Sequence, residues 1–237
     1  MSELTYPIPW DVVFSLTPHI VHGTQMSVDR FTSGIASRIQ PPPLIEDSDN
    51  LPASSRFVLV ANHYQRRGLW IAHSASIITQ TIRSHYGLDD PPMRWVVTAN
   101  WPPWRVGPWR IPSPGDWLLP RVANALSCYP VAFAGTNPRS TARLLRRLLR
   151  DAATIDRPIG VFPEGTAGVA GQWSPALPGV GRLLHQLAKL GLPVQPVAIT
   201  EQDRFVIRFA PTISAEEIRS SSDPAQLALE HVRSAAH

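Results

Sequence analysis

Short apolar runs alternate with longer amphipathic segments along this chain of 237 residues. The runs are rich in β-branched and aromatic residues and are bounded by Pro, Gly or polar residues, which predicts buried strands. In the longer segments apolar residues recur every three or four positions, which predicts helices with one buried face. Strands that alternate with helices indicate an α/β fold: a single domain with a largely parallel central sheet flanked by helices. The strands are expected at residues 57–60, 93–99, 128–133, 158–161 and 193–200, with an edge strand at 204–210.

The same periodicity, together with helix-end signals, predicts four principal helices. Gly87 ends the first, and Asp223 caps the last. The segment 138–153 has one stripe of leucines and arginines over the rest of its surface. This pattern favours a helix packed on the core with a solvated basic face over a helix docked on anionic lipid. The helices are expected at 69–86, 138–153, 179–190 and 223–235.

Two segments leave alternatives open. Residues 1–50 are interpreted as an N-terminal arm and loop that precede the α/β domain at 51–237. Within the arm, residues 6–16 form either a short helix in a membrane interface or a hydrophobic arm packed on the domain. In 101–112, Trp and Arg interleave with so many prolines that an ordinary helix or central strand is excluded. One interpretation is a loop that rests on lipid headgroups or covers an acyl-chain pocket. The other is a cap whose Trp side chains are buried against the core.

Composition narrows the class of protein. A hydrophobic content of 43% and a charged content of 17% are typical of a folded protein. No apolar run reaches the roughly 18 residues that a membrane-spanning helix needs, and the start of the chain lacks the pattern of a secretory signal. Cys128 is the single cysteine, so an intrachain disulfide is excluded and a buried, inert thiol is expected.

The positive charge comes almost entirely from arginine, because Lys189 is the only lysine in a chain of net charge +4. Arginine suits phosphate and carboxylate groups, and the eight tryptophans suit a lipid headgroup surface. No recognition helix, zinc motif or aromatic-basic motif indicates nucleic acid as a partner. We therefore expect a membrane surface as a partner, and no nucleic acid.

Polar chemistry follows two of the predicted strands. Asn62 and His63 come directly after the strand at 57–60, and the sequence Phe-Pro-Glu-Gly-Thr begins at Phe162, at the end of the strand at 158–161. In α/β proteins, ligands usually bind at the carboxyl ends of the strands. The histidine can accept a proton near neutral pH, and the second motif supplies the carboxylate of Glu164. The two motifs together predict an active site.

These motifs resemble those of the glycerophospholipid acyltransferases, the lysophosphatidate-acyltransferase-like superfamily. That family carries Asn-His followed, after four residues, by Asp; then Phe-Pro-Glu-Gly-Thr-Arg; then a strand of the type Val-Pro-x-x-Pro-Val. Here the first motif begins at Asn62, the second lies at 162–167, and the strand corresponds to 193–199. The resemblance extends over roughly residues 52–210. It differs in three places. Gly68 replaces the Asp, Ala167 replaces the Arg, and the strand at 128–133 lacks the phosphate-contacting Arg that ends a strand in the family.

The resemblance implies an O-acyltransferase that moves a fatty acyl group from acyl-CoA or acyl-ACP to a hydroxyl of a lysophospholipid or related lipid. No cofactor or metal is implied, and the acyl thioester is a co-substrate. The family pattern makes His63 the general base and links Glu164 to the acceptor site; both are taken as catalytic residues. We expect the substrate-binding residues to be Asn62, Arg66, Arg67, Phe162, Pro163, Gly165, Thr166 and Arg139.

The missing Asp leaves the orientation of the His63 imidazole to another group. Three substitutes stay open: Glu164, a backbone carbonyl, or an acidic residue such as Asp116. If none is present, the alternative is a catalytically inactive, acyltransferase-like lipid-binding protein. In either case the resemblance implies a peripheral protein on the cytoplasmic face of a membrane, with a possible acyl carrier protein partner.

Overall fold

The computed structural model describes residues 5–64, 66, 68–98, 104–107, 109–111, 113, 115–131, 138–165 and 173–237. In residues 104–106, 109–111, 138–141 and 144 only the backbone is described.

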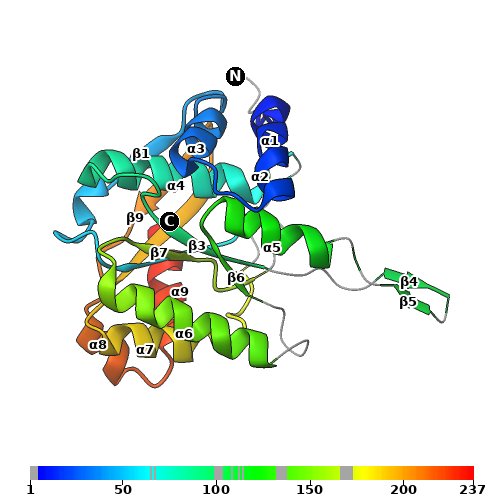
Figure 1. The fold of residues 1–237 in the computed structure, drawn as a ribbon. Helices are drawn as coiled ribbons and strands as arrows, with labels where there is room; N and C mark the ends of the chain where they lie inside the picture. The colour runs from blue at the N-terminus through cyan, green and yellow to red at the C-terminus, as the bar shows by residue number, and fades with distance from the viewer. Residues whose placement is uncertain are drawn as a thin grey trace.

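A seven-stranded sheet forms the centre of the described part of the molecule (Figure 1). Five neighbouring strands are parallel to one another, β9 is antiparallel to β8, and β1 is parallel to β9. The prediction of an α/β domain with a largely parallel sheet is confirmed. In spatial order the strands are β1 (Leu44–Glu46), β9 (Phe205–Phe209), β8 (Val194–Glu201), β2 (Val58–Ala61), β7 (Ile159–Val161), β3 (Arg94–Thr98) and β6 (Tyr129–Val131).

Helices cover both faces of this sheet, and the alternation of side chains along β2 explains how. Leu59 and Ala61 point into a core shared with α4 (Ile71–Tyr86), while Val58 and Val60 point into a second core shared with α6, α7 and α9. A central strand buried on both faces must be apolar at every position, and all four β2 residues are buried. The helices of the second face are α6 (Pro138–Thr154), α7 (Val180–Lys189), α8 (Ala215–Ser220) and α9 (Pro224–Ala235).

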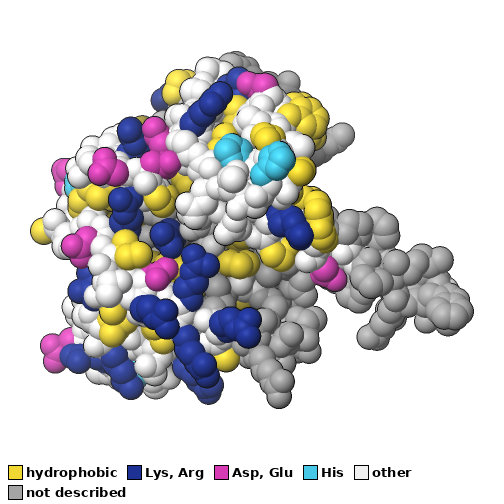
Figure 2. Space-filling model, viewed as in Figure 1, with side chains coloured by type: hydrophobic (Ala, Val, Ile, Leu, Met, Phe, Trp, Pro, Cys, Tyr) yellow, Lys and Arg dark blue, Asp and Glu magenta, His cyan; other side chains and the backbone are white. Residues whose placement is uncertain are grey.

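The four predicted helices are confirmed within a few residues. Gly87 follows α4 with a left-handed φ of 63°, and the Asp223 carboxylate caps α9 by accepting the Gln226 N–H at 3.0 Å. On α6, Leu148 is buried while Arg143 and its neighbouring arginines are exposed, as expected for a core-packed helix with a basic outer face. Figure 2 shows these basic side chains gathered over α6.

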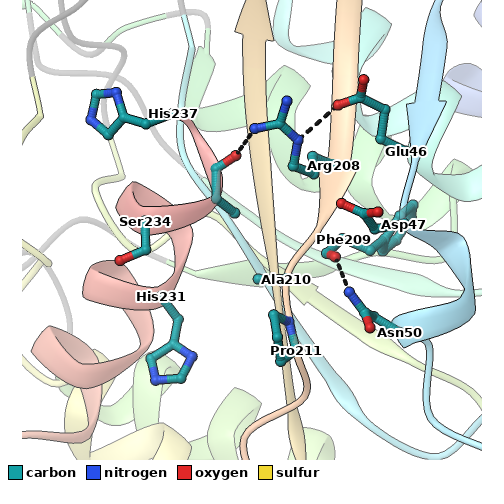
Figure 3. Close-up of a pocket in the computed structure, with 11 residues that line it drawn as sticks. Glu46, Asp47, Asn50, Arg208, Phe209, Ala210, Pro211, His231, Ser234 and His237 are labelled. Atoms are coloured by element: carbon teal, nitrogen blue, oxygen red, sulfur yellow. Dashed lines mark hydrogen bonds and ion pairs between the residues drawn. The ribbon is translucent and has the colours of Figure 1, made fainter.

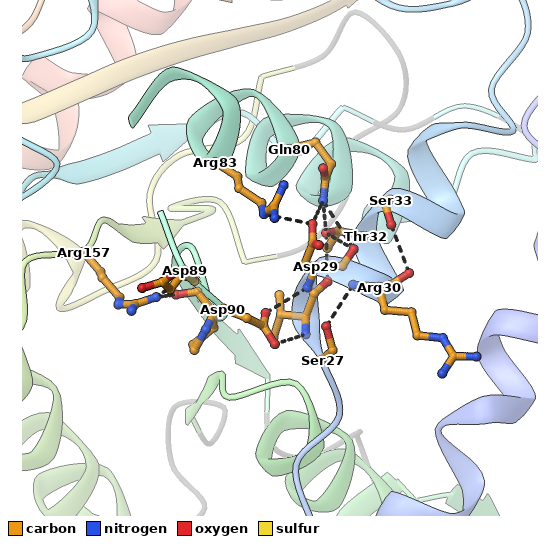
Figure 4. A network of polar contacts seen from close by, with 12 residues as sticks. Ser27, Asp29, Arg30, Thr32, Ser33, Gln80, Arg83, Asp89, Asp90 and Arg157 are labelled. Carbon is orange, nitrogen blue, oxygen red and sulfur yellow. Dashed lines mark hydrogen bonds and ion pairs between the residues drawn. The ribbon is translucent and has the colours of Figure 1, made fainter. Parts of the chain in front are cut away.

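The N-terminal segment is tied to α4. It forms α1 (Trp10–Ser15), α2 (Thr17–His22) and α3 (Val28–Ala36). Asp90 accepts the Val28 and Asp29 N–H groups at 3.2 and 2.9 Å, and Gln80 on α4 donates to Asp29 and Thr32 at 3.0 and 2.7 Å (Figure 4). This network satisfies the first N–H groups of α3 and fixes α3 on α4. Helix α3 is therefore packed on the domain, whereas the two alternatives for residues 6–16 stay predictions.

Helix α1 exposes its aromatic side chains. Trp10 is 57% exposed, Phe14 is 65% exposed, and their rings stack at 5.8 Å. Figure 2 shows hydrophobic side chains over α1. Among the described residues, no helix is long and apolar enough to cross a membrane.

Two expectations about the sheet were wrong. The strand at 204–210 was expected at an edge, but β9 lies between β8 and β1. The loop expected at the end of residues 1–50 instead contains β1 and a 3₁₀ turn at Ser48–Asn50. A three-residue strand is too short to give a periodic signal, and its pairing with β9 was needed to define it.

Two further elements were not expected. The segment 101–112 contains a separate antiparallel hairpin, formed by β4 (Trp104–Val106) and β5 (Trp109–Ile111). The contacts proposed for its Trp side chains lie outside the described residues. Helix α5 (Gly115–Ala125) follows it and was missed because Pro120 lies inside it.

Candidate active site

The two sequence motifs lie side by side. Strands β2 and β7 are parallel neighbours in the register Val58 to Ile159 and Val60 to Val161. The residues after both strands therefore reach the same edge of the sheet, as the sequence predicted. His63 follows β2 and Glu164 follows β7, and the two residues are in direct contact.

Glu164 braces this edge through its carboxylate. Its Oε2 accepts the His63 backbone N–H at 2.7 Å, and its Oε1 accepts the Ser174 N–H at 3.0 Å. The side chain is buried, with an exposed fraction of 4%, so these charge-assisted bonds are shielded from water. The hypothesis that Glu164 orients the imidazole was wrong, because its bonds go to the main chain of His63 and Ser174.

The turn after Glu164 is tightly closed. The Gly165 N–H donates to the Phe162 carbonyl at 3.1 Å, and the Leu177 N–H donates to the Pro163 carbonyl at 2.8 Å. Gly165 has a φ of +64°, and a Cβ there would lie 2.0 Å from the Leu177 side chain. Glycine is therefore required by both the backbone conformation and the contact.

The His63 imidazole rests on aromatic rings. It meets Phe162 edge-on, with ring centroids 5.5 Å apart, and Phe162 stacks on Trp95 at 4.8 Å and 10°. Among the described residues, the buried Nδ1 of His63 has no hydrogen-bond partner. Burial lowers the pKa of His63 below its ordinary value of 6.5, because the charged imidazolium loses hydration.

Gly68 lies in the loop after β2 in a left-handed backbone conformation. Gly68 has a φ of +85°, and a Cβ there would meet no atom within 4 Å. The position is open, but its backbone conformation is one that residues with side chains rarely adopt.

Asn62 holds β2 to β8. Its Nδ2 donates to the Ile199 carbonyl at 3.0 Å, and its Oδ1 accepts the Ile199 N–H at 2.7 Å. The amide thus extends the pairing of the two strands past the end of β2. Its substrate-binding role stays a prediction.

Arg66 takes part in a cluster that the sequence did not suggest. It forms an ion pair with Glu201, whose other carboxylate oxygen accepts the Tyr6 hydroxyl at 3.0 Å. The guanidinium also lies 5.5 Å from the centre of the Tyr6 ring. The cluster joins the N-terminal segment to the loop after β2. A phosphate-binding role for Arg66 stays a prediction.

The structure describes the other residues expected at the site only in part. Arg67 and Thr166 lie outside the described residues, and Arg139 is described only as backbone in the first turn of α6. Asp116 is exposed in the first turn of α5. Burial raises the pKa of the Cys128 thiol to about 12, which disfavours the nucleophilic thiolate.

Sequence reasoning missed Trp95, Gly160, Glu201 and Tyr6. Trp95 pairs with Gly160 across β3 and β7, and a Cβ on Gly160 would lie 2.4 Å from the Trp95 ring. A glycine inside an otherwise apolar strand marks a close approach of this kind, so Gly160 was the available signal.

A pocket of about 840 Å³ lies elsewhere, between the C-terminal end of α9 and the residues after β1 and β9 (Figure 3). None of its lining residues belongs to the candidate site. Its Arg208 already donates to Glu46 at 2.7 Å and to the Ala235 carbonyl at 2.6 Å. In the part of the chain that the structure describes, no group of three or more His, Cys, Asp or Glu could hold a metal ion.

The fold is similar to that of a solved α/β acyltransferase. Among solved structures, the chain is similar to the 1-acyl-sn-glycerophosphate (LPA) acyltransferase PlsC from Thermotoga maritima. The TM-score is 0.58 at 17% sequence identity, over 88% of this chain and 76% of that chain. At this identity the similarity concerns the fold. No protein-family model and no curated protein sequence matches the chain.

Proposed function

We propose that this protein is an O-acyltransferase that moves a fatty acyl group from an acyl thioester, acyl-CoA or acyl-ACP, to a hydroxyl of a lysophospholipid or related lipid. The observation that carries the proposal is the direct contact between the motifs of His63 and Glu164 at adjoining strand ends. The similarity of the fold to the LPA acyltransferase supports the same reaction class.

In this proposal His63 is the general base. Its neutral imidazole takes the proton of the acceptor hydroxyl through Nε2, since Nδ1 is buried, while the oxygen attacks the thioester carbonyl. The resulting tetrahedral intermediate collapses, the C–S bond breaks, and the thiolate leaves as a thiol after taking up the proton. No acyl-enzyme forms. The lowered pKa of His63 supports the role, because the ring stays unprotonated at neutral pH.

We propose that the reaction takes place at a membrane surface, with the protein bound peripherally. The exposed Trp10 and Phe14 of α1 supply rings of the kind that settle among headgroups. Trp117 on α5 is 55% exposed, and the Arg121 guanidinium lies 4.4 Å from the centre of its ring. An aromatic residue joined to a cation suits an anionic lipid surface.

The second candidate is a catalytically inactive lipid-binding protein. Two observations favour it: Gly68 stands where the family pattern has its orienting carboxylate, and the His63 Nδ1 has no hydrogen-bond partner among the described residues. In serine proteases, loss of the equivalent carboxylate lowers kcat by about 10⁴.

The experiment that separates them is thiol release from long-chain acyl-CoA and acyl-ACP, with a panel of hydroxyl-bearing lipids that includes lysophosphatidate. Wild type is compared with His63→Ala and with His85→Ala, which changes an exposed histidine on α4. Acceptor-dependent release that only His63→Ala abolishes supports the enzyme. No release from folded protein that binds vesicles supports the lipid-binding protein.

A further inference from the structure

The His63 ring needs a defined orientation, since a general base acts only when its nitrogen faces the hydroxyl proton. The main chain of His63 is fixed by Glu164, but a backbone hydrogen bond leaves the rotation of the ring free. The ring contact recorded for His63 is the edge of Phe162, with centroids 5.5 Å apart and planes at 64°.

Phe162 is itself held by a fixed surface. Its ring stacks on Trp95, and Trp95 lies against Gly160, where a Cβ would come within 2.4 Å of the Trp ring. Gly160 lies in β7 and Phe162 directly follows it, so the two residues are two positions apart on an extended segment and Trp95 can contact both.

The far side of Trp95 is anchored to α4. The Trp95 Nε1–H donates to the Thr79 hydroxyl at 3.0 Å, and that hydroxyl donates to the Ala75 carbonyl at 2.6 Å. Thr79 is fully buried and Trp95 is 6% exposed, so the anchored end of this chain of contacts is shielded from solvent, while Phe162 and His63 are half-buried.

We propose that Phe162 and Trp95 are positioning residues, which hold the His63 imidazole by aromatic packing at the place where Gly68 has removed the family's carboxylate. The inference rests on the proposed function, because it concerns the orientation of the same base. Aromatic pairs prefer edge-on or offset geometries, so a fixed Phe162 ring favours one plane for the imidazole. Unlike a carboxylate, this support adds no negative charge beside the base.

The test measures ring orientation and turnover separately. In protein labelled with ¹³C-histidine, the His63 ring signals are assigned from their loss in His63→Ala. Phe162→Leu and Trp95→Leu are expected to shift these signals and to lower kcat roughly 10- to 100-fold, with a smaller change in KM. Phe162→Tyr and Trp95→Phe keep the aromatic contacts, so the His63 ring signals are expected to stay close to their wild-type positions.

The matched control is Phe57→Leu, which makes the same substitution in the same apolar core, where Phe57 packs against Tyr86. It should leave the His63 signals and kcat unchanged. Equal losses in Phe57→Leu, or unchanged signals and kcat in both leucine variants, overturn the proposal. If a leucine variant does not fold, Phe162→Met and Thr79→Val replace it, and unchanged His63 signals in both have the same meaning.

The thiol-release assay and the NMR signals test the proposed function and the positioning role separately. If wild type releases no thiol with any acceptor, the acyltransferase proposal fails, and the NMR signals still decide whether Phe162 and Trp95 orient His63.

Discussion

Glu164 is the residue that joins the two motifs of the site. Its two oxygens bind backbone N–H groups on either side, one in the loop after β2 and one at Ser174. A buried side chain that accepts two backbone N–H bonds resists replacement by a group that accepts them less well. The contacts of Glu164 therefore give it a structural role that does not depend on substrate.

Glu164→Gln is expected to lose about 1 to 3 kcal/mol of unfolding free energy, since a neutral amide binds the two N–H groups less strongly and brings an unpaired NH₂ group into the site. Acyl transfer should fall with it, because the His63 backbone is no longer fixed. Urea unfolding and thiol release measure the two effects. Glu216→Gln on the exposed surface of α8 is the matched control and should change neither.

His63 sets the expected pH dependence. Burial lowers its pKa below 6.5, so the neutral base persists as the pH falls through 6.5 and is protonated only at lower pH. We expect kcat/KM to lose activity on the acid side below 6.5, measured over roughly pH 5 to 8. An acid limb centred above 6.5 would contradict this environment for the ring.

The free energy of unfolding should also decrease as the pH falls below 6.5. Just below pH 6.5 the unfolded chain binds a proton at His63 that the folded protein does not, so stability falls as the pH decreases through this window. The pH profile of unfolding by urea, compared between wild type and His63→Ala, measures this contribution.

At the scale of elements, the packing of β3 against β7 requires a residue without a side chain at position 160. Trp95 occupies the space where a Cβ of Gly160 would lie, and the same ring supports Phe162. Close-packed interiors do not absorb an added methyl without shifting their neighbours.

Gly160→Ala is therefore expected to cost about 1 to 3 kcal/mol in urea unfolding and to displace Trp95, visible in its fluorescence and in lower kcat. Gly181→Ala on α7 is the matched control, because its Cβ would make an ordinary contact at 3.6 Å. In a helix that change is expected to be neutral or stabilising. Equal stability of the two variants would contradict the close packing of Trp95.

At the scale of the whole molecule, an exposed aromatic surface and the candidate site are physically linked. Trp10 and Phe14 lie a few residues beyond Tyr6, which bonds Glu201 beside Arg66 of the site loop.

Trp10→Ser and Phe14→Ser are each expected to weaken binding to anionic phospholipid vesicles by about tenfold, since each removes one buried ring from the lipid interface. Co-sedimentation with vesicles measures the loss. Leu44→Ser changes an exposed apolar residue on β1, away from α1, and should bind as wild type does. Equal weakening in all three variants would contradict a role for α1 in docking.

The sequence by itself determined the α/β class, the four principal helices and the two strand ends that carry polar chemistry. These depend on periodicity and end signals within contiguous residues, as in the helix that Gly87 ends.

The tertiary structure alone decided the partners of these residues. Glu164 meets His63 across 101 positions, and Arg66 meets Glu201 across 135, because strand order brings their loops to one edge. The placement of β9 inside the sheet and the support of Phe162 by Trp95 have the same origin. Periodicity fixes which face of an element is buried, but only the assembled sheet determines which side chains that face meets.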